Sequence, residues 1–195
     1  MATWNGICGA SSDDAKQAST TVTLTDAPIA LTAGTHWAGL RFPSCPVANS
    51  ETINSAVLTL ELTAGSTDPG NLVIYGENAD DSATFTTTNN DISGRTRTTA
   101  SVTWTAGARG VGDKNAPDLS AILAEITTRA GYAAGNDVAL ILDATASTSL
   151  RFTSYDTSTS LCARLTVDYG GGGQPKAARG RLVPGMGRAH GQQGW

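Results

Sequence analysis

Groups able to carry out nucleophilic catalysis are scarce in this chain. A Ser, Cys or Thr nucleophile needs a base beside it, most often His, and the only two histidines are His36 and His190. His36 begins a predicted strand and His190 lies in the C-terminal segment, so we expect a structural or solvent-exposed role for each. The sequence contains no GxSxG, HExxH or P-loop pattern. These residues therefore predict a protein that is not an enzyme.

Paired carboxylates would suit glycoside hydrolysis, and four glutamates could contribute, namely Glu51, Glu61, Glu77 and Glu125. Nothing in the sequence singles out a pair among them. Glu61 is expected to face solvent from a strand, and Glu125 lies on the polar side of a predicted helix. A hydrolase therefore remains a third hypothesis, which would need two carboxylates in a cleft.

Acidic loop residues could bind calcium, which takes several oxygen ligands. The candidates are Asp13 with Asp14, Asp80 with Asp81, and Asp91, but none follows the EF-hand spacing. We expect solvated loop acids, and a structural calcium ion at one end of the fold stays open. No other metal or cofactor is predicted.

Aromatic side chains could form a platform for sugar binding, and the candidates are Trp4, Trp37, Trp104, Tyr75, Tyr132 and Tyr155. Trp37 and Trp104 lie in strand patterns, where packing in the core is the usual outcome. Trp4 precedes the first predicted strand and is freer. Trp4 and Tyr155 are therefore the residues for which we predict glycan contact, if the protein binds glycans.

The end of the chain differs from the rest in composition. Gly170 to Gly173 lead into a stretch without hydrophobic periodicity that carries four basic residues and no acidic one. Arg and Trp are common interface anchors, and an extended segment can cover a large surface. We therefore predict a docking segment over residues 170–195, following a single domain over residues 1–169; the alternative is a solubilising tail. Its predicted contact residues are Lys176, Arg179, Arg181, Leu182, Val183, Met186, Arg188 and Trp195.

Charge and composition limit the function classes. All 17 acidic residues lie in residues 1–169 with nine of the 13 basic ones, so this part carries a net charge of −8. An acidic body argues against nucleic-acid binding. No apolar run is long enough to span a bilayer, and no secretory signal is visible, which predicts synthesis in a cytoplasm. Cys8, Cys45 and Cys162 show no metal-ligand spacing; a single disulfide, for example between Cys8 and Cys45, stays open.

Alternating apolar residues predict about eight strands with polar turns between them. The clearest lie in residues 56–63, 137–143 and 161–169, and shorter ones lie in residues 20–25, 36–42, 71–78, 101–104 and 150–155. One short amphipathic helix interrupts them, because Leu119, Ile122, Leu123 and Ile126 follow the helical spacing. Pro117 and Asp118 suit its start, and Gly131 its end. The pattern predicts an all-β fold, a two-sheet jelly-roll sandwich with one helix.

Several stretches resemble the DNRLRE-like, carbohydrate-binding-module-like jelly-roll domains of bacterial surface proteins and phage virion proteins. They are Ser12 to Ala15 and residues 37–42, 52–62, 101–104, 117–142, 151–156 and 163–169. The block from the helix to the following strand is the most specific. The resemblance spans roughly residues 10–169 and implies a sandwich used for adhesion, display or carbohydrate contact, without catalysis.

A small, free-standing member of this family that is made in a cytoplasm resembles a phage virion component. Jelly rolls on phage heads commonly serve as decoration or cement proteins, an argument from fold analogy. The sequence thus leads us to expect a capsid decoration protein located in the virion. Its expected partners are the capsid protein or sister subunits, and by analogy it would form a homo-oligomer, such as a trimer. The alternative is a carbohydrate-binding or adhesion module in a tail fibre or on a cell surface.

Overall fold

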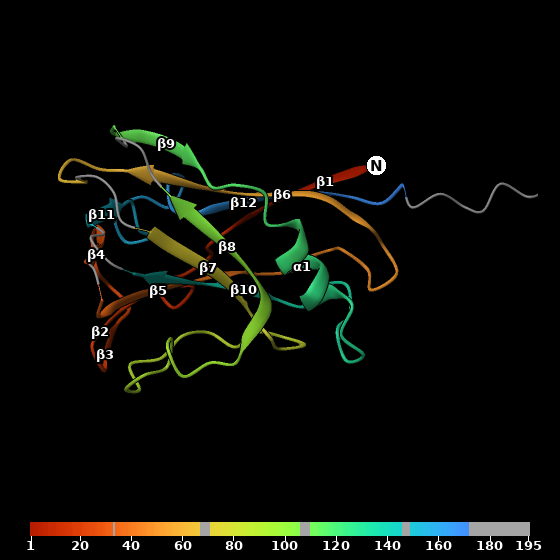
Figure 1. The fold of residues 1–195 in the computed structure, drawn as a ribbon, viewed down its shortest axis with the longest axis horizontal. Coiled ribbons are helices and arrows are strands. Elements are labelled where there is room, and N and C mark those ends of the chain that lie inside the picture. Colours follow the sequence, from red (N-terminus) through yellow and green to blue (C-terminus); the bar gives the residue numbers. More distant parts are fainter. Residues whose placement is uncertain (33, 67–70, 106–109, 146–148, 172–195) are drawn as a thin grey trace, which may run out of the picture.

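The protein folds into two antiparallel six-stranded sheets that face each other (Figure 1). The computed structural model describes residues 1–32, 34–66, 71–105, 110–145 and 149–171. The first sheet contains β1 (Ala2–Ile7), β12 (Arg164–Tyr169), β6 (Ile53–Leu62), β11 (Ser149–Phe152) and β4 (Ile29–Thr32) in that order, with β9 (Gly112–Asn115) paired to β6. The second contains β3 (Thr21–Thr23), β2 (Asp14–Ala18), β5 (His36–Phe42), β10 (Val138–Ala144), β7 (Asn71–Glu77) and β8 (Arg97–Thr105). The predicted all-β sandwich is confirmed.

The core between the sheets consists of the inward residues of alternating strands. In β6, Leu58, Leu60 and Leu62 are fully buried, as the sequence predicts, while the residues between them are only half-buried. β12 contributes Leu165 and Val167 in the same way. Alternation in these strands leaves their other side chains on the outer face of the first sheet.

One helix, α1 (Ser120–Thr127), closes the side of the sandwich between β6 and β8 (Figure 1). The four predicted apolar positions, from Leu119 to Ile126, are all fully buried. A Cβ atom at Gly76 of β7 would lie 2.6 Å from Ile126 Cδ1, so the helix packs directly on the strand backbone. Asp118 precedes the helix and accepts a hydrogen bond from the Ala56 amide at 2.8 Å, which ties the helix start to β6.

A long loop, residues 78–96, covers the outer face of the second sheet and adds a third layer (Figure 1, yellow-green). Phe85 and Ile92 of this loop pack on Ala15, Ala139 and Ile141 to form a second, smaller buried cluster. Consequently β10 is buried on both faces rather than on one. The alternation correctly predicted that Val138, Leu140 and Leu142 are buried. It did not indicate that loop 78–96 also buries the outer face of β10.

Four of the observed strands were not predicted from the sequence: β1, β2, β4 and β9. β9 has the sequence GDKN and pairs with β6 through its backbone, so no apolar alternation marks it. The predicted strand at 161–169 also begins later, because β12 starts at Arg164 and Leu161 is an exposed loop residue. The helix likewise ends at Thr127, before the predicted stop at Gly131.

The two ends of the described body lie side by side, because β1 and β12 are paired with Ala2 opposite Tyr169. Gly170 still belongs to the body: its amide donates to the Thr52 carbonyl oxygen at 2.9 Å. Residues 174–195, with all the predicted tail contacts, lie outside the described residues. In the part of the chain that the structure describes, no helix has the length and apolar character required to traverse a membrane.

Candidate ligand-binding site

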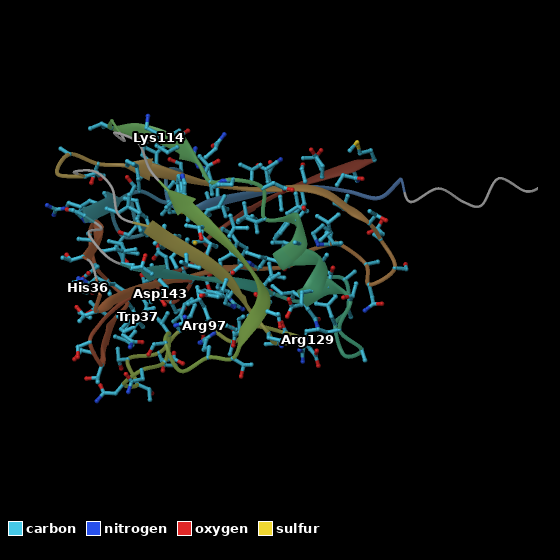
Figure 2. All side chains as sticks on the ribbon, in the orientation of Figure 1. His36, Trp37, Arg97, Lys114, Arg129 and Asp143 are labelled. Carbon is cyan, nitrogen blue, oxygen red and sulfur yellow. The ribbon has the colours of Figure 1, made fainter. Side chains whose placement is uncertain are left out.

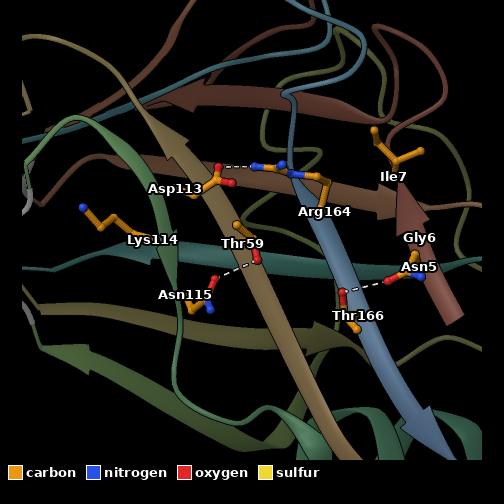
Figure 3. Close-up of a pocket in the computed structure, with 9 residues that line it drawn as sticks. All are labelled: Asn5, Gly6, Ile7, Thr59, Asp113, Lys114, Asn115, Arg164 and Thr166. Carbon is orange, nitrogen blue, oxygen red and sulfur yellow. Dashed lines mark hydrogen bonds and ion pairs between the residues drawn. The ribbon is translucent and has the colours of Figure 1, made fainter. Parts of the chain in front are cut away.

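A hollow of about 700 Å³ lies on the outer face of the first sheet, over β1, β12, β6 and β9 (Figure 3). Most of its lining residues are polar or charged, and Ile7 is an exposed apolar one. The lining residues are Asn5, Gly6, Ile7, Thr59, Asp113, Lys114, Asn115, Arg164 and Thr166.

Strand register explains why these residues meet, although they come from four distant parts of the chain. Ile7 stands opposite Arg164, Arg164 opposite Thr59, and Thr59 opposite Asn115. Side chains on directly opposite residues lie on the same face of a sheet and can contact each other. The four strands therefore place one continuous row of side chains across the hollow.

Two hydroxyl groups fix two amide side chains at the hollow. Thr166 Oγ1 donates to Asn5 Oδ1 at 3.0 Å, and Thr59 Oγ1 donates to Asn115 Oδ1 at 2.9 Å. Both amide oxygens thus accept hydrogen bonds from the protein. Among the described residues no hydrogen bond is formed by the amide nitrogens of Asn5 and Asn115, and each nitrogen can donate two hydrogen bonds to a ligand.

Charged groups frame the same row. The guanidinium of Arg164 contacts the Asp113 carboxylate, while Arg164 Nε is buried without a hydrogen-bond partner. Glu61 neighbours Asp113 on β6, and the hydrogen bond between their carboxyl groups raises the pKa of Glu61 and lowers that of Asp113. Lys114 lies at the rim on this side of the sandwich, opposite Trp37, Arg97 and Asp143 (Figure 2).

The hollow therefore offers hydrogen-bond donors, the Asp113 carboxylate as an acceptor, and the apolar side chain of Ile7, which is 37% exposed. Such a mixture suits a ligand with hydroxyl groups and apolar C–H faces. These groups can bind and orient a ligand through hydrogen bonds and ion pairing.

The predicted glycan contacts, Trp4 and Tyr155, do not line this hollow. Both are half-buried and pack against the main core, Trp4 from β1 and Tyr155 from the loop after β11. Trp104 is a core residue, as expected. Trp37 departs from the prediction, because it points to the outer face of the second sheet and packs half-buried beside the small cluster under loop 78–96.

The predicted carboxylates and His36 have structural partners. Glu125 accepts hydrogen bonds from the Thr99 and Ala100 amides at 2.7 and 2.8 Å. Glu51 accepts from the Ala48 amide, and Glu77 pairs with Arg95. His36 Nδ1 bonds with the backbone of Thr32 at 2.8 Å.

The acidic loop pairs considered for calcium are also engaged by the protein. Asp13 pairs with Arg41, Asp80 with Arg129, and Asp91 with Arg95. Asp14 is buried, with one carboxylate oxygen accepting from the Tyr155 amide at 2.6 Å and the other unpartnered. No group of three His, Cys, Asp or Glu side chains in the described ranges is arranged to bind a metal ion.

Comparison with known proteins adds no family assignment. No family model matches this chain, and no curated protein sequence is similar to it. The residues of the hollow were not among the predicted site residues. The signal that could have found them is the polar half of the strand alternation, such as Arg164 and Thr166 between the apolar residues of β12.

Proposed function

We propose that this protein is a non-enzymatic virion structural protein, a decoration or cement protein of a phage head. Its sandwich is displayed, and the basic segment after Gly171 binds the capsid protein or a sister subunit. The proposal rests on the family resemblance of the body and on the charge contrast between an acidic body and a basic C-terminal segment.

The position of the chain exit supports this arrangement. β12 ends at Tyr169 beside the start of β1, and Asn54 Nδ2 donates to the Gly170 carbonyl oxygen at 2.9 Å. A segment that leaves from one end of the sandwich can hold the body to a surface while the other end and the outer face of the first sheet stay free.

The test uses purified particles of the virus that encodes the chain. We expect the full chain in the particles, and we expect much less of it when Lys176, Arg179, Arg181 and Arg188 are all changed to Ala. Arg151→Ala, a charge change at an exposed body residue, should leave incorporation unchanged. Absence of the wild-type chain from particles refutes the virion role, whereas normal incorporation of the fourfold variant refutes only the docking segment.

A second candidate function is saccharide binding, which the outer-face hollow favours. Its donors, acceptors and single apolar side chain match the groups of a sugar, although no aromatic residue lines it. Binding by a displayed sandwich would make the protein an adhesion module, and this function is compatible with a place on a virion.

A glycan array with the full chain tests this candidate, with variants at matched arginines. Arg164 and Arg97 have similar side-chain exposure, 29% and 26%, and each pairs with one aspartate, but on opposite outer faces. We expect Arg164→Ala to lower binding at least tenfold and Arg97→Ala to leave it unchanged. Loss on changing Trp4 or Tyr155 instead would move the site to the aromatic residues, and absence of any glycan signal would refute the candidate.

A further inference from the structure

Two of the three cysteines meet where the first and last strands pair. Cys8 follows β1 directly, and Cys162 lies two residues before β12, while Ile7 stands opposite Arg164 in the pairing. Cys162 Sγ lies 3.8 Å from the Cys8 carbonyl oxygen, so the two residues are in direct contact. Both side chains are buried, and both are free thiols.

The third cysteine lies in a different environment. Cys45 neighbours Tyr132, whose hydroxyl donates to the Cys45 carbonyl oxygen at 3.4 Å. The Cys45 amide donates to the Asn136 carbonyl oxygen, so this residue belongs to the loop region around 132–136. The pairing of Cys8 with Cys45 that the sequence left open is therefore not the one that the fold favours.

We propose that Cys8 and Cys162 form an intramolecular disulfide when the chain meets a small-molecule disulfide oxidant such as oxidised glutathione. The Cys162 thiolate attacks one sulfur of the oxidant, forming a mixed disulfide and releasing one glutathione thiolate. The Cys8 thiolate then attacks Cys162 Sγ and displaces the second glutathione. Two protein thiols lose two electrons and two protons, and the oxidant is reduced to two molecules of glutathione.

The order of the two steps follows from the contact between the thiols. The hydrogen bond from Cys8 lowers the pKa of Cys162, while the same contact, burial and the nearby carboxylate of Asp14 raise the pKa of Cys8. The thiol that ionises more readily is the better attacking group at neutral pH. Cys162 is therefore the first to react.

Access comes from the edge position of these segments. In the described part of the first sheet β1 pairs with β12 and forms one edge, so its end can open locally while the other strands of the sheet stay paired. Ser160 and Leu161, just before Cys162, are exposed. A reagent can thus reach the thiols through local opening of the 160–162 segment.

The cross-link would close a loop from residue 8 to residue 162, almost the whole sandwich. Long closed loops gain most from a cross-link in the chain-entropy account, and we expect oxidation to raise Tm by roughly 5–15 °C. The inference goes beyond the proposed virion role and does not depend on it.

The test exposes the full folded chain to oxidised glutathione, denatures it, blocks the remaining thiols with iodoacetamide, and maps the tryptic peptides. We expect the peptide of residues 1–16 to be linked to that of residues 152–164, with Cys45 alkylated. Cys45→Ser should retain the link and the Tm rise, and Cys8→Ser and Cys162→Ser should lose both. Because a variant could fail to fold, the wild-type map decides: three alkylated cysteines, stable mixed disulfides only, or a link that includes Cys45 would overturn the proposal.

Discussion

The packing of loop 78–96 on the second sheet makes a sharp prediction for Gly39→Ala. A Cβ atom at position 39 would lie 2.3 Å from the Phe85 ring, far inside the usual contact distance. The ring cannot move away freely, because Arg95 stacks on it at 4.1 Å and donates hydrogen bonds to the Ala83 and Thr84 carbonyl oxygens at 2.8 and 2.9 Å. Adding one methyl group therefore disturbs the whole third layer.

Two known costs bound the loss in free energy of unfolding that Gly39→Ala should cause. Overpacking a buried site costs about 1–3 kcal/mol, and full loss of a buried phenylalanine costs about 3–5 kcal/mol. Because Phe85 is only 1% exposed and its ring would have to leave its site in part, we expect about 3 kcal/mol. For a chain of this size that lowers Tm by about 6–12 °C.

Urea unfolding followed by tryptophan fluorescence measures this loss. Gly110→Ala is the matched control, since a Cβ atom there has no neighbour within 4 Å. Combining Gly39→Ala with Phe85→Leu should cost at least 1 kcal/mol less than the sum of the single changes. A Gly39→Ala protein within about 0.5 kcal/mol of the control, or additive costs, would refute the proposed contact.

Two buried polar side chains give further predictions. Burial is the main cause that raises the pKa of Asp14 from 3.8 to about 7, so the folded chain holds a proton that the unfolded chain loses above pH 4. The free energy of unfolding should fall by up to roughly 4 kcal/mol between about pH 4 and pH 7. Asp14→Asn should reduce this pH dependence, measured by urea unfolding at pH 5 and pH 8. An unchanged pH dependence in the variant would contradict the assignment to Asp14. Gln17 is fully buried and accepts from the Ile92 and Ser93 amides at 3.1 and 2.8 Å. Gln17→Leu leaves both amide donors unpaired, so we expect the free energy of unfolding to fall by about 3 kcal/mol. Amide hydrogen exchange in residues 90–94 should also become faster. Unchanged exchange there would show that Gln17 does not hold the loop.

The sequence was sufficient for the fold wherever a strand has one apolar face. β6 and β12 follow the alternation closely, and α1 follows the spacing of its four apolar residues. The third layer could not be predicted, because loop 78–96 covers β10 through Phe85 and Ile92, two isolated apolar residues in a polar stretch. Hydrophobic periodicity cannot reveal a covering loop whose own apolar residues are not periodic.

The candidate site was predictable only in its residue types. Arg164 and Asn115 are separated by many residues and become neighbours through their common partner Thr59 on β6. That register depends on β9, a strand without apolar residues, so no local pattern reveals it. The cysteine contact has the same origin, since Cys8 and Cys162 approach through the pairing of the first and last strands.

The pairing of Ala2 with Tyr169 also determines how this sandwich can be rearranged genetically. The start of β1 and the end of β12 lie next to each other, so a short linker could join them into a circular chain. New termini could then be opened in an exposed turn such as residues 86–89. For the same reason the whole sandwich can be placed inside a surface loop of another protein and separate that loop's two ends by little more than one strand spacing. This sandwich can therefore be joined to another protein by insertion into a loop as readily as by fusion at a terminus.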